Sequence, residues 1–79
     1  RLTVSLSAAI EYIGVGENVD PAAYVAGVTD AEGDSLDTDI VSASSNVDPE
    51  TPGCYEIHYQ ASDGDGQSAE NWLTVVVEG

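Results

Sequence analysis

The sequence predicts an all-β protein, a sandwich of about seven short strands. The clearest evidence is residues 54–62, where apolar and polar side chains alternate with a period of two. The apolar face of this stretch carries Tyr55, Ile57, Tyr59 and Ala61, and the polar face carries Cys54, Glu56, His58 and Gln60. Turn signals recur about every 8–12 residues, and no segment shows the apolar period of a helix, which together favour a sandwich.

The other elements follow from the same two signals, alternation and turn residues. Pro52-Gly53 precedes the stretch 54–62 and the run Asp63 to Gly66 ends it, because Pro presets φ and Gly accepts positive φ. Asp20-Pro21 marks a further turn, and residues 29–39 are expected to form an acidic loop. We expect further strands over residues 2–7, 10–15, 24–28, 40–43, 44–47 and 68–77.

The chain is strongly acidic. Fifteen acidic residues face a single basic residue, Arg1, among 79 residues, which gives a formal net charge of −14. Such a surface repels nucleic acid and anionic lipid, and it favours divalent cations and basic partners. No apolar run approaches the ~20 residues that cross a bilayer, so we expect no membrane insertion. The length suits one small domain and the chain begins without Met, so we expect residues 1–79 to be a single module of a larger multidomain protein.

The single cysteine, Cys54, cannot form an internal disulfide. We expect a half-buried small residue at a strand end, or alternatively a thiol that is reactive or pairs with another chain. His58 lies four residues away, roughly 13 Å along the strand, which is too far for a catalytic dyad. His58 is therefore expected to be exposed to solvent rather than to act as a ligand.

Several segments resemble bacterial immunoglobulin-like domains, the cadherin-like or HYR-like modules that occur in tandem on surface and secreted proteins. The similarity covers roughly residues 10 to 77 and lies in Val28–Asp34, Thr51–Tyr55, Tyr59–Asp63, Gly66–Ala69 and Leu73–Val77. The chain departs from the pattern at Cys54, at Gln67 in place of Asn, and by one Asp fewer in Glu32-Gly33-Asp34. The resemblance implies an immunoglobulin-like Greek-key β-sandwich in which Tyr55 forms a tyrosine corner.

In such a sandwich the B–C and F–G loops share one end, so two acidic loops that are distant in sequence are expected to meet. The first contains Asp30, Glu32 and Asp34, and the second contains Asp63 and Asp65. Together they offer oxygen ligands for Ca²⁺, with a Kd on the order of 10⁻⁴–10⁻³ M, at the end where a preceding module would join. The spacing is not that of an EF-hand, and the alternative is that both loops are ordinary solvated turns.

Trp72 is the candidate ligand-binding residue. In the register that buries Leu73 and Val75, Trp72 faces outward. An exposed aromatic ring on a flat sheet stacks on pyranose rings in many sugar-binding modules, and it is also a common protein contact. Tyr12 and Tyr24 are candidates to extend this surface. Alternatively, Trp72 covers the open end of the core or packs on a neighbouring domain.

These observations predict a non-catalytic spacer module of a bacterial protein that is secreted or attached to the cell surface or cell wall, where it supports adhesion. Its expected partners are the adjacent domains of the same chain, with a glycan or a host protein as a further partner, and no cofactor beyond Ca²⁺ is expected. We do not expect an enzyme, because every acid is placed on a turn or an outward face rather than in a pocket that excludes water. The alternative is a carbohydrate- or protein-binding module that uses the sheet face around Trp72.

Overall fold

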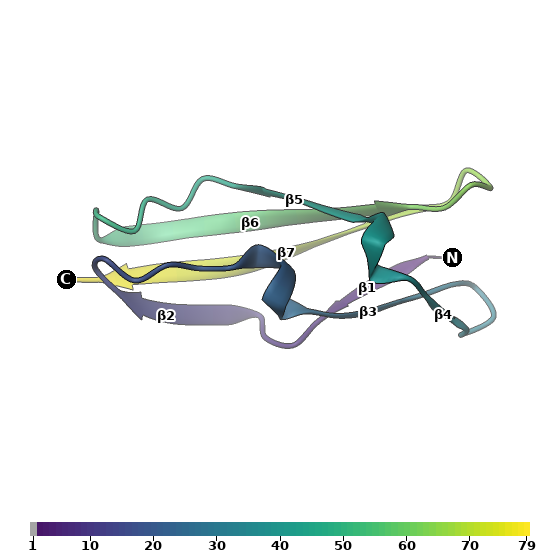
Figure 1. Cartoon of the computed structure of the whole chain (residues 1–79), viewed down its shortest axis with the longest axis horizontal. Helices are drawn as coiled ribbons and strands as arrows, with labels where there is room; N and C mark the ends of the chain where they lie inside the picture. Colours follow the sequence, from purple (N-terminus) through teal and green to yellow (C-terminus); the bar gives the residue numbers. More distant parts are fainter. Residues whose placement is uncertain (1) are drawn as a thin grey trace.

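The computed structural model describes residues 2–79, which form two packed β-sheets (Figure 1). One sheet has the strand order β1-β3-β4, with strands Thr3–Leu6 (β1), Val25–Thr29 (β3) and Ser35–Leu36 (β4). The other has the order β2-β7-β6-β5, with strands Ile10–Gly14 (β2), Ser68–Glu78 (β7), Gly53–Ser62 (β6) and Val41–Ser45 (β5). Two short 3₁₀ helices, Pro21–Tyr24 (η1) and Thr38–Ile40 (η2), lead into β3 and β5. The predicted all-β sandwich is confirmed.

The longest feature is the hairpin of β6 and β7, which pair antiparallel from Gly53 opposite Val77 to Ser62 opposite Ser68. Because side chains alternate along a strand, the hairpin turns one apolar face towards the three-stranded sheet. The core therefore lies between the two sheets and consists of Leu2, Val4, Ile13, Val28, Ile57, Tyr59, Ala61, Leu73, Val75 and Val77.

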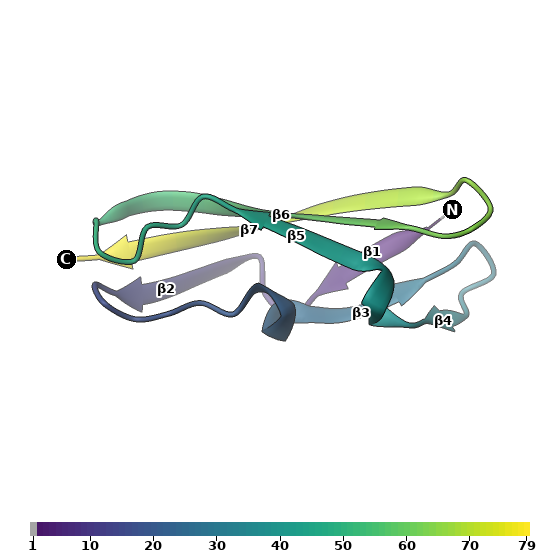
Figure 2. The ribbon, with the colours of Figure 1, turned by 45° about the horizontal axis from the view of Figure 1, so that its top comes forward.

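The N-terminal segment contributes one strand to each sheet. β1 pairs antiparallel with β3, with Val4 opposite Val28. After a short crossover, β2 pairs parallel with β7, from Ile10 opposite Thr74 to Gly14 opposite Glu78. Figures 1 and 2 show that the strands run along the long axis of the molecule and that the two marked chain ends lie at opposite ends of it.

Three expectations about the strands need correction. Tyr24 belongs to η1 rather than to a strand, because the Asp20 side chain accepts the Ala22 N–H at 3.2 Å and Pro21 presets the first helical φ. The expected loop over residues 29–39 contains β4, which reaches its pairing with β3 through a turn at Gly33 (φ +84°). Residues 44–47 form no strand of their own, since β5 ends at Ser45.

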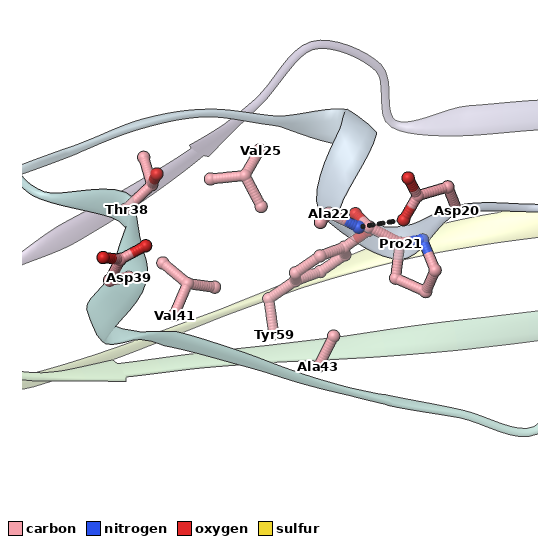
Figure 3. Close-up of a pocket in the computed structure, with 9 residues that line it drawn as sticks. All are labelled: Asp20, Pro21, Ala22, Val25, Thr38, Asp39, Val41, Ala43 and Tyr59. Carbon is pink, nitrogen blue, oxygen red and sulfur yellow. Dashed lines mark hydrogen bonds between the residues drawn. The ribbon is translucent and has the colours of Figure 1, made fainter.

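Two tyrosine hydroxyls of β6 bond to backbone carbonyls. Tyr55 donates to the Thr51 carbonyl at 2.8 Å, which confirms the predicted tyrosine corner. Tyr59 is fully buried and donates to the Pro21 carbonyl at 2.6 Å, so it joins the four-stranded sheet to η1 (Figure 3). Burial raises the pKa of the Tyr59 hydroxyl, and the nearby Tyr24 and Asp20 raise it further.

Replacing Tyr59 by Phe should lower the free energy of unfolding by about 1 kcal/mol, because the Pro21 carbonyl loses its donor while the ring still fills the core. For a domain of this size, thermal unfolding followed by circular dichroism should show a melting temperature lower by about 4–8 °C. The matched control is Tyr12→Phe, whose side chain is 57% exposed and whose change should stay below about 0.5 kcal/mol. Equal losses in the two variants would contradict the role assigned to the Tyr59 hydroxyl.

Candidate functional site

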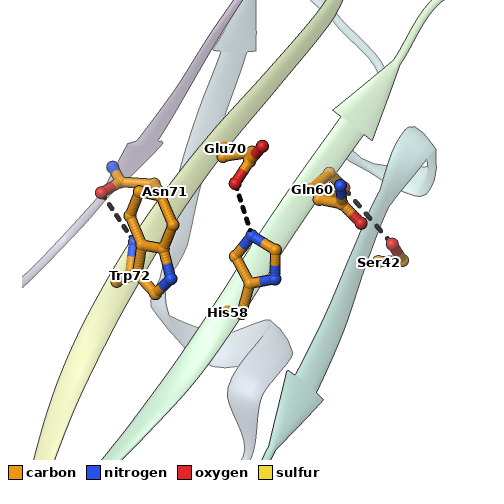
Figure 4. A network of polar contacts seen from close by, with 6 residues as sticks. All are labelled: Ser42, His58, Gln60, Glu70, Asn71 and Trp72. Carbon is orange, nitrogen blue, oxygen red and sulfur yellow. Dashed lines mark hydrogen bonds and ion pairs between the residues drawn. The ribbon is translucent and has the colours of Figure 1, made fainter.

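Trp72 stands on the outer face of the four-stranded sheet and is 49% exposed, as its register predicts. It lies directly opposite His58 of β6, and the two rings stack with centroids 5.0 Å apart and planes 15° apart. The Nε2 atom of His58 is in turn 2.8 Å from Oε2 of Glu70 (Figure 4). The indole is therefore held on one side by a histidine that is itself held by a carboxylate.

Asn71 fixes the strand from the opposite face of the same sheet. Its side-chain amide donates to the Val4 carbonyl at 2.9 Å, which bonds β7 to β1 of the other sheet. Its Oδ1 atom accepts the backbone N–H of Trp72 at 2.9 Å. The backbone under Trp72 is thus tied to both sheets, so the ring projects from a well-defined position.

The other side of Trp72 is open. Since β6 and β2 flank β7 on opposite sides, the indole face that His58 does not cover turns towards the β2 side. A shallow hollow lies there, and besides Trp72 it is lined by Leu6, Ser7, Ala8, Ala9 and Asn71. A planar apolar ligand has access to this face of the ring.

Of the two tyrosines that were candidates to extend this surface, Tyr12 lies on the same face of the sheet as Trp72 and Tyr24 does not. Tyr12 is paired with Val76, which lies four positions along β7 from Trp72. Because side chains alternate with a period of two, Tyr12 and Trp72 are on the same outer face. Tyr24 lies in η1 and packs against the core. Burial raises the pKa of Tyr24, and the nearby carboxylates of Glu11 and Asp20 raise it further.

The two acidic loops do meet at one end of the sandwich. The loop between β3 and β4 and the loop between β6 and β7 both lie at the end where the described chain starts (Figure 1). They border a common hollow of about 300 Å³, to which Asp30, Glu32, Asp63 and Asp65 contribute, together with Leu2. Asp34 does not line this hollow. The convergence that the resemblance implied is therefore present for four of the five predicted residues.

The two loops are built in the same way. In the first, Oδ1 of Asp30 accepts the N–H groups of Glu32 and Asp34, at 3.0 and 2.9 Å. In the second, Oδ1 of Asp63 accepts the N–H groups of Asp65 and Gln67, at 2.8 and 3.0 Å. The fourth residue of each loop is a glycine with φ of +84°. The shared pattern Asp-x-acid-Gly stands in the sequence as a short repeat, and it is the signal that could have indicated a common loop structure.

These hydrogen bonds assign the first aspartate of each loop to backbone structure. In residues 2–79, no three side chains among His, Cys, Asp and Glu stand in an arrangement that would hold a metal ion. A calcium ion at this end would be held by the carboxylate oxygens that make no backbone bond and by loop carbonyls. Calcium binding by these loops stays a prediction.

The same use of aspartate recurs along the chain. A carboxylate accepts the N–H of the residue two positions further on at Asp20, Asp30, Asp37, Asp48 and Asp63. Such turns satisfy backbone donors that would otherwise lack a partner where a strand ends or a 3₁₀ helix begins. Part of the acidity is therefore structural.

Cys54 and His58 both lie on the outward register of β6. Cys54 is exposed there, opposite Val76 of β7, and not half-buried as expected. His58 is not free in solvent as expected, because only about a third of its side chain, 34%, is exposed and it contacts both Glu70 and Trp72. The alternation had placed His58 correctly on the outer face, but its partners come from β7.

The comparison with protein families identifies the class. The profile of the family described as "Bacterial surface protein, Ig-like domain" matches residues 9–77. The chain therefore belongs to this family of bacterial immunoglobulin-like domains. Among curated proteins, none matches the sequence at a significant level.

Solved structures agree on the fold. A lipoprotein from Bacteroides thetaiotaomicron superimposes with a TM-score of 0.71 over 98% of this chain, at 24% identity. A structure of ZmpB from Clostridium perfringens, which contains CBM51-2 in complex with GlcNAc and the INT domains, gives a TM-score of 0.70 over 98% of this chain, at 23% identity. The ZmpB M60 catalytic domain with CBM51-1 and CBM51-2 gives 0.69 over 98%, at 23% identity. This chain spans 37%, 16% and 8% of the lengths of those three chains.

Within residues 2–79, no helix combines the length and apolar character that crossing a membrane requires.

Removing the carboxylate at Asp63 should destabilise the fold by about 1–2 kcal/mol, because Asp63→Ala leaves the Asp65 and Gln67 N–H groups without their acceptor. Asp63→Asn keeps an acceptor oxygen and removes one charge from an acidic chain, so its stability should stay near that of the parent. The control Asp65→Ala should cost little. Urea unfolding of the three variants decides this, and an equal loss for Asp65→Ala would contradict the turn mechanism.

Millimolar Ca²⁺ should raise the melting temperature more than Mg²⁺ or Na⁺ at matched ionic strength, if the two loops share an ion as predicted. The Ca²⁺-specific part of the rise should disappear in Asp65→Asn, in which the backbone hydrogen bonds of the turn are retained. Differential scanning fluorimetry is sufficient to measure it. Equal shifts with all three salts would mean that added cations only screen the negative charge and would count against the calcium prediction.

Proposed function

We propose that this domain is a non-catalytic spacer, one rigid module in a longer secreted or cell-surface protein of a bacterium, where it supports adhesion by holding neighbouring domains apart. The observation that supports this most directly is the shape of the molecule. Its extents are 43 × 18 × 16 Å, and the described chain starts at one end of the long axis and finishes at the other (Figure 1). Domains attached at the two ends would be separated by the full length of the sandwich.

The strand pairing supports a role under load. β2 and β7 run parallel to each other and to the long axis, with five residue pairs in register. A pull on the two chain ends draws β2 and β7 in opposite directions along their length. All the hydrogen bonds between the two strands are then loaded together in shear, instead of one after another as in peeling. This is the arrangement that a spacer under tension needs.

The comparisons support the location and the setting. The family is one of bacterial surface proteins, and one similar structure is a lipoprotein. The similar chains are longer than this one, which favours a setting as one module among several, with the adjacent domains as its main partners. A non-catalytic role is supported by the placement of the acids, since the aspartates that begin the turns accept backbone N–H groups.

Stretching the domain from its two ends in optical tweezers tests this proposal. The extension should stay near the folded length until one abrupt step, which leads towards a fully extended length of about 270 Å at ~3.4 Å per residue. A gradual extension without a step would contradict a rigid spacer.

A pair of proline variants tests the shear arrangement. The Ala9 carbonyl accepts the Thr74 N–H, and a parallel ladder uses every second residue of a strand, so the Glu11 N–H faces β7. The Tyr12 N–H faces away and meets the Glu11 side chain instead. Glu11→Pro should therefore lower the unfolding force more than Tyr12→Pro, with Glu11→Ala as the control for the lost side chain. Equal forces for the two proline variants would contradict load-bearing by β2 and β7.

A second candidate function is a binding module that uses the sheet face around Trp72, for a glycan or for a host protein. The specific observation in its favour is the half-exposed indole, which is fixed by His58 on one side and open on the other. An aromatic face of this kind suits the apolar face of a pyranose ring. Because the chain carries a net charge of −14, a neutral sugar fits it better than an anionic one.

Tryptophan fluorescence separates the two functions, because Trp72 is the only tryptophan in the chain. Methyl glycosides of glucose, galactose and N-acetylglucosamine at millimolar concentration should shift or quench its emission if the domain binds neutral sugars. His58→Ala should weaken that response, because the ring loses its support. No response to any of the three sugars would leave the spacer as the function and count against a glycan site.

A further inference from the structure

The four-stranded sheet ends at an unprotected strand, β5. Within residues 2–79, β5 pairs with β6 and with no strand on its other side. Edge strands are usually guarded by charges, Pro or bulges, whereas Val41–Ser45 reads Val-Ser-Ala-Ser-Ser and contains neither a charge nor a Pro. The free edge of β5 can therefore accept another strand.

The inner face of β5 is also uncovered. Ala43 pairs with Tyr59 and Ser45 pairs with Ile57, so both share the face that points towards the core. Tyr59 and Ile57 are fully buried, yet Ala43 and Ser45 are exposed. The reason is the narrower opposite sheet, in which β4 has two residues. The core therefore reaches β5 only at Val41, and no strand of the opposite sheet covers Ala43 and Ser45.

A hollow of about 440 Å³ occupies this position, between β5 and the two 3₁₀ helices (Figure 3). Its floor is mostly apolar and includes Val25, Val41, Ala43 and the ring of Tyr59. Asp20 and Asp39 stand at its rim and are both exposed. An apolar side chain would be buried on the floor, and a cation beside it would meet the carboxylates.

The charge of the chain points to the kind of partner. A second copy would bring another net charge of −14 against the same acidic rim, which disfavours pairing between copies through β5. A basic segment, by contrast, is attracted by the overall charge and by Asp20 and Asp39. The free backbone edge favours an extended conformation, because a strand satisfies the edge and places alternate side chains over the hollow.

We propose that β5 and its hollow bind an extended segment of another protein in which apolar and basic residues occur together. The segment adds as a fifth strand to the order β2-β7-β6-β5. Its inward side chains lie over Ala43 and Tyr59, and its cations pair with Asp39 and Asp20. This interaction goes beyond the spacer function, since it uses one side of the molecule and leaves both ends and the Trp72 face free.

The probe is the synthetic peptide acetyl-Lys-Thr-Val-Thr-Val-Thr-Lys-amide, in which the strand period of two places both Lys on the same face as both Val, titrated into the ¹⁵N-labelled domain at 150 mM NaCl. Two control peptides separate the contributions. One carries Glu in place of both Lys, and the other carries Pro in place of the central Thr, which blocks strand pairing while keeping the charge. Only the parent peptide should shift the backbone amide signals of β5.

Two matched variants test the rim. Asp39 and Glu50 each follow a turn aspartate by two positions, and in each case the backbone N–H, not the carboxylate, bonds to that aspartate. Asp39→Asn and Glu50→Gln therefore remove one charge each and leave those turns intact. Asp39→Asn should weaken binding about two- to fivefold, as expected for an exposed ion pair, whereas Glu50→Gln should leave it unchanged.

A third variant tests the hollow itself. Ala43→Glu fills part of the hollow but makes the chain more acidic. Binding in the hollow should therefore become weaker, whereas non-specific attraction of a basic peptide to the acidic chain should become stronger. Loss of the β5 shifts in Ala43→Glu supports the proposal, and stronger binding overturns it. Equal weakening by Asp39→Asn and Glu50→Gln, or no β5 shift at millimolar peptide, also overturns it. So does concentration-dependent dimerisation of the domain alone in sedimentation, accompanied by β5 shifts, because the edge would then belong to a second copy.

Discussion

The pairing of β6 with β7 is the interaction on which the other features of this domain depend. Its ten residue pairs place each side chain of the hairpin on one of two faces. The inner face supplies Tyr59 and Leu73 to the core, and the outer face brings His58 and Trp72 into contact. The loop that closes the hairpin, which starts at Asp63, meets the loop between β3 and β4. A shift of one residue in this register would exchange the core and the outer surface.

Aspartate turns solve a problem that a small sandwich has at each change of direction. Backbone N–H groups at strand ends need acceptors, and a chain of 79 residues has few buried groups to offer. The carboxylates of Asp30 and Asp63 supply two acceptor contacts each without a partner from elsewhere in the fold. The cost is a concentration of negative charge, which attracts cations and repels anions.

Local pattern predicted much of the candidate site, and pairing between distant residues accounts for what it missed. Alternation along residues 68–77 was sufficient to expose Trp72 and to bury Leu73, because the period of two is a property of any strand. It gave no sign that His58 would stack on Trp72, since that contact depends on which residues of β6 and β7 face each other. Likewise, β4 was missed because a pair of residues carries no measurable period.

By itself, the sequence determined the fold class and the outward position of Trp72, because alternation and turn chemistry act over a few neighbouring residues. The tyrosine corner of Tyr55 followed from the resemblance to immunoglobulin-like domains. Only the tertiary structure decided that Asp34 stays outside the hollow shared by the two acidic loops, which ring supports Trp72, and how far the core extends under β5. The uncovered side of β5 is the clearest case. Nothing in Val41–Ser45 indicates it, because the exposure of Ala43 results from the short β4 in the opposite sheet, and the relative widths of two sheets are set by long-range packing.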